Sequence, residues 1–450
     1  MRQSSEGLDM SSEWPRRRLG DHCLKIGSGA TPTGGKDGYL KHGPFMLIRS
    51  QNIYNDGFKP NGLAFISAEQ AKKLDGVAIE ADDVLLNITG DSVARVCLAG
   101  SQYLPARVNQ HVAIIRPRRD VFDSRYLRYF LASDYQQDLM LGMAAAGATR
   151  NALTKAMIEG FKVPSPPMAI QRGIADILSA LDDRITLLRE TNATLEAIAQ
   201  ALFKSWFVDF DPVRARMEGR APEGMDEATA ALFPDGFEES ELGLVPRGWR
   251  VLTFAEVFEI NPTRKLTKGS MAPYLDMASL ATSGHCVEAP IQREMGSGAK
   301  FRNGDTLLAR ITPCLENGKS AFVDFLAEGQ TGWGSTEFLV LRPKGPLPEY
   351  LGYLLCRHPA FREYAIQSMS GTSGRQRIQN DVLCRHLLAV PGREIALAFG
   401  EVIEPIQKSI ASNYESAQTL ATLRDTLLPR LISGQLRLPE AGLQTQEAAT

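Results

Sequence analysis

The chain has 450 residues and 44% of them are hydrophobic, which is enough for two or three domains with separate cores. No apolar run approaches the roughly 20 residues that a membrane helix needs, and the first residues lack the apolar stretch of a signal peptide. We therefore expect a cytoplasmic protein that has no membrane partner.

The net charge of −2 argues against a nucleic-acid binder only until it is divided along the chain. Residues 208–248 hold ten acidic and four basic residues, so the rest of the chain carries a net charge of +4. Basic residues also cluster locally, as PRRR at 15–18 and RPRR at 116–119. These clusters are compatible with phosphate contacts, although arginines that are simply solvated would give the same pattern.

Residues 12–165 combine short β-type runs with loops rich in Gly, Pro, Ser and Thr. The runs include DDVLLNIT at 82–89 and HVAIIRP at 111–117, and a helix is expected near YLRYFL at 126–131. We interpret this region as an α+β globular domain with a predominantly antiparallel sheet.

Residues 166–207 are expected to form one long helix, because their apolar residues recur every seven positions as in a coiled-coil seam. Asn192 lies on or beside this seam, where a polar residue can fix the register, but a position facing solvent is equally compatible. The predicted seam residues are Ile174, Leu181, Leu188, Leu195 and Leu202.

The segment 208–246 is acidic and punctuated by Pro and Gly, and we interpret it as a connector between domains. A second globular domain is expected at 247–391, a second long helix at 392–433 and a polar tail at 434–450. The two long helices can pair with each other and form a stiff spacer. The second helix has its own seam, which consists of Ile403, Ile406, Ile410, Leu420, Leu427 and Leu431.

The second half of the chain repeats the first half. GDTLLARIT matches DDVLLNIT, and EFLVLRP matches HVAIIRP, at nearly constant separations: 222 positions from Asp83 to Asp305 and 226 from Arg116 to Arg342. The repeat predicts internal pseudo-two-fold symmetry, with two similar globular domains of the α+β class separated by two long helices. A two-part site on duplex DNA has the matching symmetry, while duplication without a paired ligand is the alternative.

Signatures of catalysis are missing from the sequence. GSGATPTGGK at 27–36 resembles a phosphate-binding loop, but Gly35 stands where the motif requires lysine. Asn261 and Pro262 are followed by Thr and Arg, so they do not form the NPPY-type motif of adenine methylases. The six cysteines form no CxxC pair. We therefore predict neither catalytic residues nor a metal site.

Several long segments resemble the DNA-specificity subunit of bacterial type I restriction–modification systems. They are GSGATP at 27–32, ALFKSWFVDFDPVRARMEG at 201–219, ALFPDGFEESELGLVPRGW at 231–249 and LRDTLLPRLISGQLRLPE at 423–440. Together with the repeat they extend over nearly the whole chain. The resemblance implies two target-recognition domains, each reading one half of an interrupted DNA sequence, and two antiparallel coiled-coil helices that dock methyltransferase subunits.

The same resemblance implies the partners and the division of labour. Two adenine methyltransferase subunits and two motor–nuclease restriction subunits would join this chain on double-stranded DNA, as a defence against foreign DNA. S-adenosylmethionine, ATP and magnesium would be bound by those partners. This chain would bind no cofactor and would supply specificity without catalysis.

Polar residues in the loops between matching strands are candidate DNA contacts, because Arg and Lys suit guanine while Asn and Gln suit adenine. These loops differ between the modules (GSGATPTGGK against NPTRKLTKGS), which favours an asymmetric target. The candidates are Thr31, Thr33, Lys36, Gln51, Asn52, Asn109, Gln110 and Arg150 in the first module, and Arg264, Lys265, Arg310, Thr336, Arg375, Gln376, Arg377 and Gln379 in the second.

Two other functions fit parts of the pattern. A single-chain DNA-modifying enzyme would need the methyl-donor and NPPY-type motifs that are missing, and methyl-donor crosslinking would detect it. A coiled-coil scaffold that joins two domains for ligands other than DNA would lack the sequence-dependent, strongly salt-dependent affinity for duplex DNA.

Overall fold

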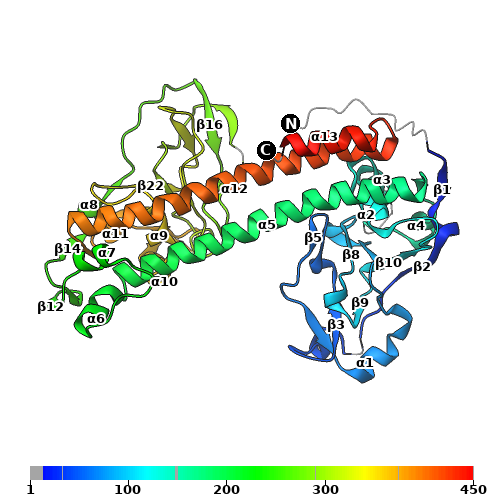
Figure 1. Cartoon of the computed structure of the whole chain (residues 1–450), viewed down its shortest axis with the longest axis horizontal. Coiled ribbons are helices and arrows are strands. Elements are labelled where there is room, and N and C mark those ends of the chain that lie inside the picture. Colours follow the sequence, from blue (N-terminus) through cyan, green and yellow to red (C-terminus); the bar gives the residue numbers. More distant parts are fainter. Residues whose placement is uncertain (1–13, 33, 147–150, 289, 373, 449–450) are drawn as a thin grey trace. The chain divides into compact units, whose positions relative to one another are not determined.

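The computed structural model describes residues 14–32, 34–146, 151–288, 290–372 and 374–448. It divides into two compact units, Met1–Thr186 with Gln418–Thr450 as unit 1 and Leu187–Ala417 as unit 2. The long helices are α5 (Met168–Phe207) and α12 (Arg393–Ser433) (Figure 1). Each of them belongs partly to unit 1 and partly to unit 2. In the described part of the chain, no helix combines the length and the hydropathy needed to cross a bilayer.

Unit 1 contains the first globular module, which precedes α5, and the helix that ends the chain. Its strands are β1 (Arg16–Arg18), β2 (Cys23–Ser28), β3 (Phe45–Ile48), β4 (Ile53–Tyr54), β5 (Gly57–Phe58), β6 (Ala64–Ile66), β7 (Val84–Asn87), β8 (Val96–Leu98), β9 (Ala106–Val108), β10 (Val112–Pro117) and β11 (Lys162–Pro164). Its shorter helices are α1 (Ala68–Lys73), α2 (Ser124–Ala132), α3 (Asp134–Ala145), α4 (Lys155–Glu159) and α13 (Leu438–Ala448).

Unit 2 contains the connector and the second module. Its strands are β12 (Phe237–Ser240), β13 (Gly243–Pro246), β14 (Arg250–Thr253), β15 (Phe258–Ile260), β16 (Met271–Leu275), β17 (Ile291–Glu294), β18 (Ala299–Phe301), β19 (Thr306–Ala309), β20 (Ser320–Phe322), β21 (Gly332–Gly334), β22 (Phe338–Pro343), β23 (Met369–Ser370), β24 (Arg377–Ile378) and β25 (Leu387–Val390). Its shorter helices are α6 (Asp211–Met217), α7 (Glu227–Leu232), α8 (Phe254–Val257), α9 (Leu351–Arg357), α10 (Pro359–Gln367) and α11 (Asn380–Cys384).

The internal repeat is confirmed element by element. The main sheet has the strand order β2-β10-β7-β8 in the first module and β15-β22-β19-β20 in the second, and every pairing in both is antiparallel. A smaller sheet in each module contains one parallel pair, β3 with β9 and β16 with β21, which the expectation of a predominantly antiparallel sheet did not specify. The ends of each module meet in a two-stranded pairing, β1 with β11 and β14 with β25.

A buried ion pair occupies the same place in both main sheets. Asp83, directly before β7, accepts hydrogen bonds from Arg116 Nε and Nη2, both at 2.7 Å. Asp305, directly before β19, accepts from Arg342 Nε at 2.7 Å and from Arg264 Nη2 at 2.9 Å. Both aspartates are at most 1% exposed. Because a buried carboxylate is stable only when it is paired, aspartate and arginine recur together in the repeat.

In unit 2 the second part of α5 packs antiparallel against the first part of α12. Near the end of α5, the rings of Trp206 and Phe207 lie 5.3 and 4.7 Å from that of Phe399 near the start of α12. Further back along α5, Asn192 Nδ2 donates to the carbonyl of Ile410 at 2.9 Å, and its Oδ1 accepts from Asn413 Nδ2 at 2.9 Å. Asn192 therefore faces the seam and not the solvent.

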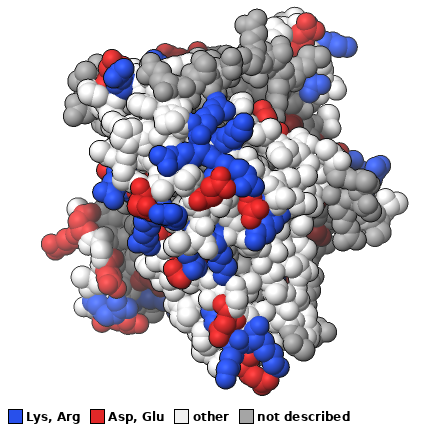
Figure 2. Space-filling model, turned by 90° about the vertical axis from the view of Figure 1, so that its right-hand side faces the viewer, with Lys and Arg blue, Asp and Glu red and all other residues white. Residues whose placement is uncertain are grey.

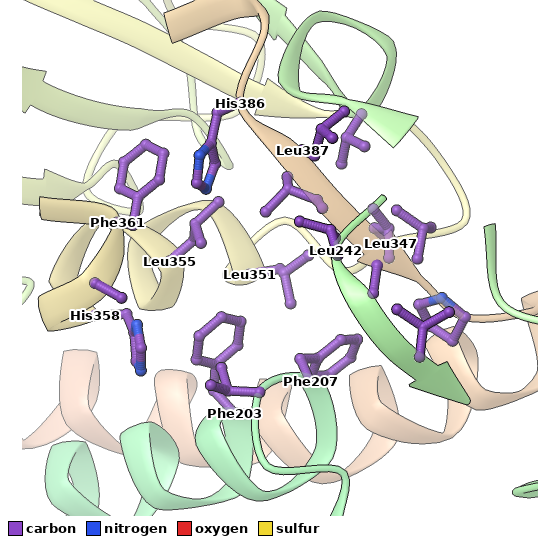
Figure 3. A pocket seen from close by; sticks show the side chains of 18 of the residues that line it. Phe203, Phe207, Leu242, Leu347, Leu351, Leu355, His358, Phe361, His386 and Leu387 are labelled. Atoms are coloured by element: carbon purple, nitrogen blue, oxygen red, sulfur yellow. The ribbon is translucent and has the colours of Figure 1, made fainter. Parts of the chain in front are cut away.

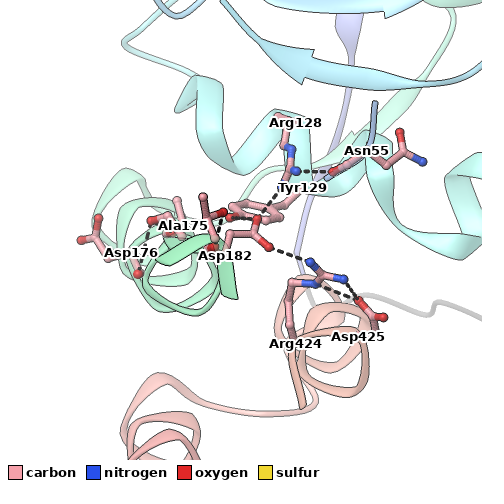
Figure 4. Close-up of polar contacts among 10 residues, drawn as sticks. Asn55, Arg128, Tyr129, Ala175, Asp176, Asp182, Arg424 and Asp425 are labelled. Carbon is pink, nitrogen blue, oxygen red and sulfur yellow. Dashed lines mark hydrogen bonds and ion pairs between the residues drawn. The ribbon is translucent and has the colours of Figure 1, made fainter. Parts of the chain in front are cut away.

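In unit 1 the first part of α5 is joined to the module and to α12 through Asp182 (Figure 4). Its carboxylate accepts from Tyr129 Oη at 2.7 Å and from Arg128 Nη1 at 3.1 Å, both on α2. Arg424 on α12 donates to the other oxygen at 2.7 Å. Arg424 interrupts the row of apolar residues along the second helix. Its charge is tolerated there because it is paired with the carboxylate of Asp182.

The connector is more ordered than the prediction of a polar linker implied. It forms α6, α7 and the hairpin β12–β13, and Phe233 is 1% exposed in the core of unit 2. Phe210 and Phe237 pack against the same core, and the Phe210 ring lies 5.5 Å from that of Trp249. The charged residues of the segment face outward while its phenylalanines are anchored inside.

The predicted polar tail also contains a helix, α13, that returns to unit 1. Leu436 and Ala441 are buried. A side chain at Gly173 on α5 would lie 2.6 Å from Leu438 Cδ1, so the glycine makes room for this leucine. Gly434, with a φ of +81°, lies against the Trp14 ring in the same way. The end of α12 is thus packed against the start of the first module.

Candidate nucleic-acid interface

Most of the candidate residues of the second module meet at one end of its main sheet. At this end β19 finishes, β22 begins and the hairpin β23–β24 is attached. Arg310 donates its backbone N–H to Glu337 at 3.0 Å, and Ile378 donates its own to Arg310 at 2.9 Å. Thr312 and Gln376 are joined by backbone and side-chain hydrogen bonds of 3.0 and 3.1 Å. The structure thus brings together Arg310, Thr336, Arg375, Gln376, Arg377 and Gln379.

This end of the sheet is polar, and it holds more positive than negative charge. Arg375 and Thr336 are exposed, and Gln379 is exposed with its amide donating to the Arg377 carbonyl at 3.2 Å. Arg310 donates to the Ile378 carbonyl at 3.2 Å. Phosphate groups and the polar edges of bases are suitable ligands for such a surface.

Arg264 and Lys265 lie away from this group. Arg264 is bound to Asp305, which precedes the start of β19, whereas Glu337 precedes the start of β22. Because β19 and β22 are antiparallel, with Thr306 opposite Leu341 and Ala309 opposite Phe338, these two carboxylates stand at opposite ends of the pair. About four residues at about 3.3 Å each separate them. Arg264 therefore has a structural role, and Lys265 beside it is exposed.

The first module has an equivalent end, where the loop between β9 and β10 stands next to Thr89 and Ala152. Gln110 is exposed there, and Asn109 Oδ1 accepts from the backbone of His111 at 3.1 Å. Thr89 Oγ1 lies 2.6 Å from His111 Nδ1. Asn109 is only 7% exposed, so its amide shapes the loop and its neighbour Gln110 offers the accessible side chain.

The remaining candidates of the first module divide between internal and accessible positions. Asn52 is 0% exposed, accepts from the backbone of Arg49 at 3.1 Å and donates to the Lys59 carbonyl at 2.8 Å, so its amide holds a turn together. Gln51 and Thr31 are exposed. Lys36 lies in a short 3-10 helix at Gly35–Gly38, and Thr33 and Arg150 lie outside the described residues.

The glycine-rich loop at 27–36 is explained by packing and not by phosphate binding. A Cβ atom at Gly29 would lie 2.0 Å from the carbonyl oxygen of Val108 and 2.3 Å from that of Asn109. Only glycine allows the loop to approach this backbone so closely.

Lysine and arginine also gather on the face of unit 1 that carries β1, interspersed with Asp and Glu (Figure 2). All three arginines of β1, Arg16–Arg18, are exposed. The second basic cluster of the sequence is less available, because Arg116 is held by Asp83 and Glu80. Within the module, Arg116 stands near the end of β10, whereas Asn109 and Gln110 precede its start. Arg116 and the candidate DNA contacts Asn109 and Gln110 therefore lie at opposite ends of that strand.

An apolar groove of about 330 Å³ lies in unit 2, where the end of α5 meets β13 and β25 (Figure 3). Phe203, Phe207 and Leu351 line it together with the rings of His358 and His386. Burial lowers the pKa of both histidines from the ordinary value of 6.5, so both are neutral near pH 7. Its lining includes no carboxylate, amine or hydroxyl side chain, so the two imidazoles are the polar side chains of an otherwise apolar groove.

His285 is the centre of a buried polar network in unit 2. Its Nδ1 lies 2.8 Å from Tyr350 Oη and its Nε2 lies 3.1 Å from Asp324 Oδ2. Gln407 on α12 donates to the same aspartate oxygen at 2.6 Å. His285 is 0% and Tyr350 2% exposed, so both side chains are shielded from solvent, and the network ties the module to α12. In the described residues, no group of three His, Cys, Asp or Glu could hold a metal ion.

The residues predicted for the helix seams are mostly buried. Leu195, Leu202 and Ile406 are half-buried. The other eight are 0–7% exposed: Ile174, Leu181, Leu188, Ile403, Ile410, Leu420, Leu427 and Leu431. Their partners are within the chain, so the seam itself is not a surface for another subunit.

Sequence reasoning missed two residues at the equivalent ends of the two main sheets, Glu337 before β22 and His111 before β10; we call these ends the recognition ends. Glu337 directly precedes the buried strand FLVLRP, and His111 directly precedes the matching strand VAIIRP. In each case the side chain two residues earlier accepts a hydrogen bond from the backbone N–H of the missed residue. Ser335 Oγ accepts from the backbone of Glu337 at 3.1 Å, just as Asn109 Oδ1 accepts from His111. Aligning the two repeats around these strands was the signal that could have found them.

The description "Type I restriction modification DNA specificity domain" belongs to a family model that matches residues 11–197. The specificity subunit of the type I restriction enzyme HindI from Haemophilus influenzae is 24% identical over 472 aligned positions, which cover 94% of this chain and 100% of that protein. The EcoKI specificity subunit from Escherichia coli K12 is 28% identical over 388 positions, which cover 83% and 77%.

A solved structure of a type I restriction–modification S subunit from M. genitalium superposes with a TM-score of 0.56. It covers 94% of this chain and 97% of that one at 13% identity. At this identity the similarity concerns the fold, and the fold is the arrangement predicted from the repeat.

Proposed function

We propose that the chain is a DNA-specificity subunit of a type I restriction–modification system, that it reads an interrupted, asymmetric DNA target with its two modules and that it docks adenine methyltransferase subunits. Recognition of a DNA sequence is its role in such a system, and catalysis is not. We propose further that two methyltransferase and two motor–nuclease subunits complete the complex in the cytoplasm.

One observation carries the proposal of two different readers. The modules have the same strand order, so their recognition ends are equivalent, but the side chains at these ends differ. Thr336 and Glu337 in the second module occupy the places of Gln110 and His111 in the first. Because base edges are distinguished by the donors and acceptors they meet, two such ends are suited to two different half-sites.

The docking of methyltransferase subunits is supported by apolar side chains on the outer side of α5. Leu187 is 52% and Ile198 44% exposed, although neighbours such as Leu188 are buried. Eleven residues turn an α-helix by about three full turns, so these two lie on one face about 16 Å apart. These two exposed side chains are therefore the points on this face of α5 where we propose contact with a methyltransferase subunit.

Under this proposal S-adenosylmethionine, ATP and magnesium are bound by the partner subunits.

The test is to map methylated adenines by long-read sequencing in a host that carries this chain with its methyltransferase. We expect one bipartite motif with different halves, which disappears when the gene for this chain is deleted. Methylation without a motif, or a motif that survives the deletion, contradicts the proposal.

A further inference from the structure

Glu337 and Arg377 are brought together at the recognition end of the second module. Glu337 directly precedes β22, and Arg377 belongs to β24, whose backbone is bridged to Ile311 after β19. Arg377 Nε lies 3.0 and 2.9 Å from the two carboxylate oxygens of Glu337, and Nη2 lies 2.6 Å from Oε1. The side chains are 44% and 23% exposed, so the pair stands at the surface with the arginine outermost.

The ion pair uses only one edge of the guanidinium. An arginine has five N–H donors in a rigid plane. Glu337 takes the Nε donor and one Nη2 donor, which form the side edge. The end edge, made of Nη1 and the second Nη2 donor, has no hydrogen-bond partner among the described residues and points away from the carboxylate.

Two parallel N–H donors at this spacing match the O6 and N7 acceptors that guanine presents in the major groove. We propose that Arg377, held in place by Glu337, reads a guanine in the half-site of the second module. The inference rests on the proposed function. Arg377 is the specificity-determining residue, and Glu337 is a positioning residue that acts through it.

A purely structural role explains the pair less well. Ion pairs between exposed side chains stabilise proteins little, and a carboxylate facing DNA repels phosphate. The main effect of Glu337 at this position is therefore to hold the Arg377 guanidinium in one orientation. Hydrogen bonding from Arg377 holds the pKa of Glu337 below its ordinary range, so the carboxylate stays charged at neutral pH. Arg310 contributes to the same lowering of the pKa, and Arg375 is exposed two residues from Arg377.

The first module provides an internal comparison. The bridge of Ile311 with Arg377 corresponds to that of Thr89 with Ala152, so alanine stands where the second module has Arg377. His111, which stands where the second module has Glu337, lies against Thr89. The scaffold is shared but the arginine–glutamate pair is not. Reading of guanine by this pair is therefore confined to the half-site of the second module.

The test uses the full chain with its methyltransferase in the host, and the readout is the methylated motif. The variants are Arg377→Ala, Arg377→Lys, which keeps the charge but loses the planar fork, and Glu337→Gln, which weakens the hold on the arginine. Arg247→Ala is the control, because Arg247, directly after the connector, also forms an exposed ion pair, with Asp235 at 3.2 Å.

We expect a fixed guanine at one position of one half of the wild-type motif. In both Arg377 variants, discrimination at that position should fall by about 5- to 150-fold, the equivalent of one bidentate base contact. Glu337→Gln should give a smaller loss at the same position. The other half of the motif, and the whole motif of Arg247→Ala, should not change.

Three results would overturn the inference. An unchanged motif in both Arg377 variants would leave the pair a structural one. A uniform loss of methylation at all sites, with the motif intact, would make Arg377 a phosphate contact. Relaxation of the position by Glu337→Gln but not by Arg377→Ala would make the glutamate a reader of cytosine. A wild-type complex without any motif would instead contradict the proposed function, so the two failures are distinguishable.

Discussion

The asparagine pair in the seam of unit 2 allows a quantitative test of the helix packing. Asn192→Ala deletes two hydrogen bonds, the one to the Ile410 carbonyl and the one from Asn413, each 2.9 Å long. A buried hydrogen bond contributes about 0.5–1.5 kcal/mol net, so the variant should lose about 1–3 kcal/mol of unfolding free energy. Asn413→Ala deletes only the shared bond and should lose about 1 kcal/mol.

Because the two residues share one bond, their effects should not be additive. The double variant should lose about 1 kcal/mol less than the sum of the single variants. Denaturant unfolding followed by tryptophan fluorescence measures this, since Trp206 lies on α5 in the same unit and packs on Phe399 of α12. Strictly additive losses, or losses within error of zero, would mean that the asparagines do not bond across the seam.

Further predictions concern assembly, pH, catalysis and spacing. Leu188→Glu, in the buried seam, should lower the melting temperature. Leu187→Glu, at the exposed neighbour, should leave the fold intact and weaken co-purification with the methyltransferase. Identical behaviour of the two variants would contradict the assignment of Leu188 to the seam and of Leu187 to the docking face. Burial lowers the pKa of His386, so its contribution to stability is present above the ordinary pKa of 6.5 and is lost as the pH falls through the lower folded value. Melting temperatures between pH 7.5 and 5 should therefore fall less steeply in His386→Phe, and equal slopes would refute this. Purified alone, the chain should neither crosslink S-adenosylmethionine nor methylate DNA; transfer by the isolated chain would contradict a pure specificity role. Four residues inserted near Ala199 add about 6 Å of helix, so the halves of the motif should move apart by one or two base pairs of about 3.4 Å, and an unchanged gap in an active complex would exclude the spacer role.

The repeat and the helix seams could be predicted because they depend on periodicity, which a sequence displays directly. Asp83 and Arg116 recur as Asp305 and Arg342 for a physical reason, since a buried carboxylate must keep its partner. The constant separation of these residues was therefore a signal of contact as well as of duplication.

Candidate DNA contacts were harder to predict because residue type does not show whether a side chain is free. Asn52 and Asn109 are of the right type to read adenine, but their amides are engaged in turns of the module itself. Asparagine side chains bond readily to nearby backbone, so an asparagine in a loop is often local structure. The guanidinium of Arg264 is likewise engaged, in the ion pair with Asp305.

The order of the connector could not be predicted from its mean polarity. Its acidic residues dominate the composition, whereas Phe233 and Phe237 determine how it packs. Composition averages over side chains that face opposite ways, and a few aromatic residues bury enough surface to order such a segment.

Independent reading by two modules is tested most directly by exchanging one of them. Residues 14–163, whose ends meet where β1 pairs with β11, would be replaced by the equivalent module of a related specificity subunit, and methylated adenines would be mapped in the host. One half of the motif should change to that of the donor, while the other half and the length of the gap stay as they were. A change in both halves, or in neither, would show that the modules do not read DNA independently.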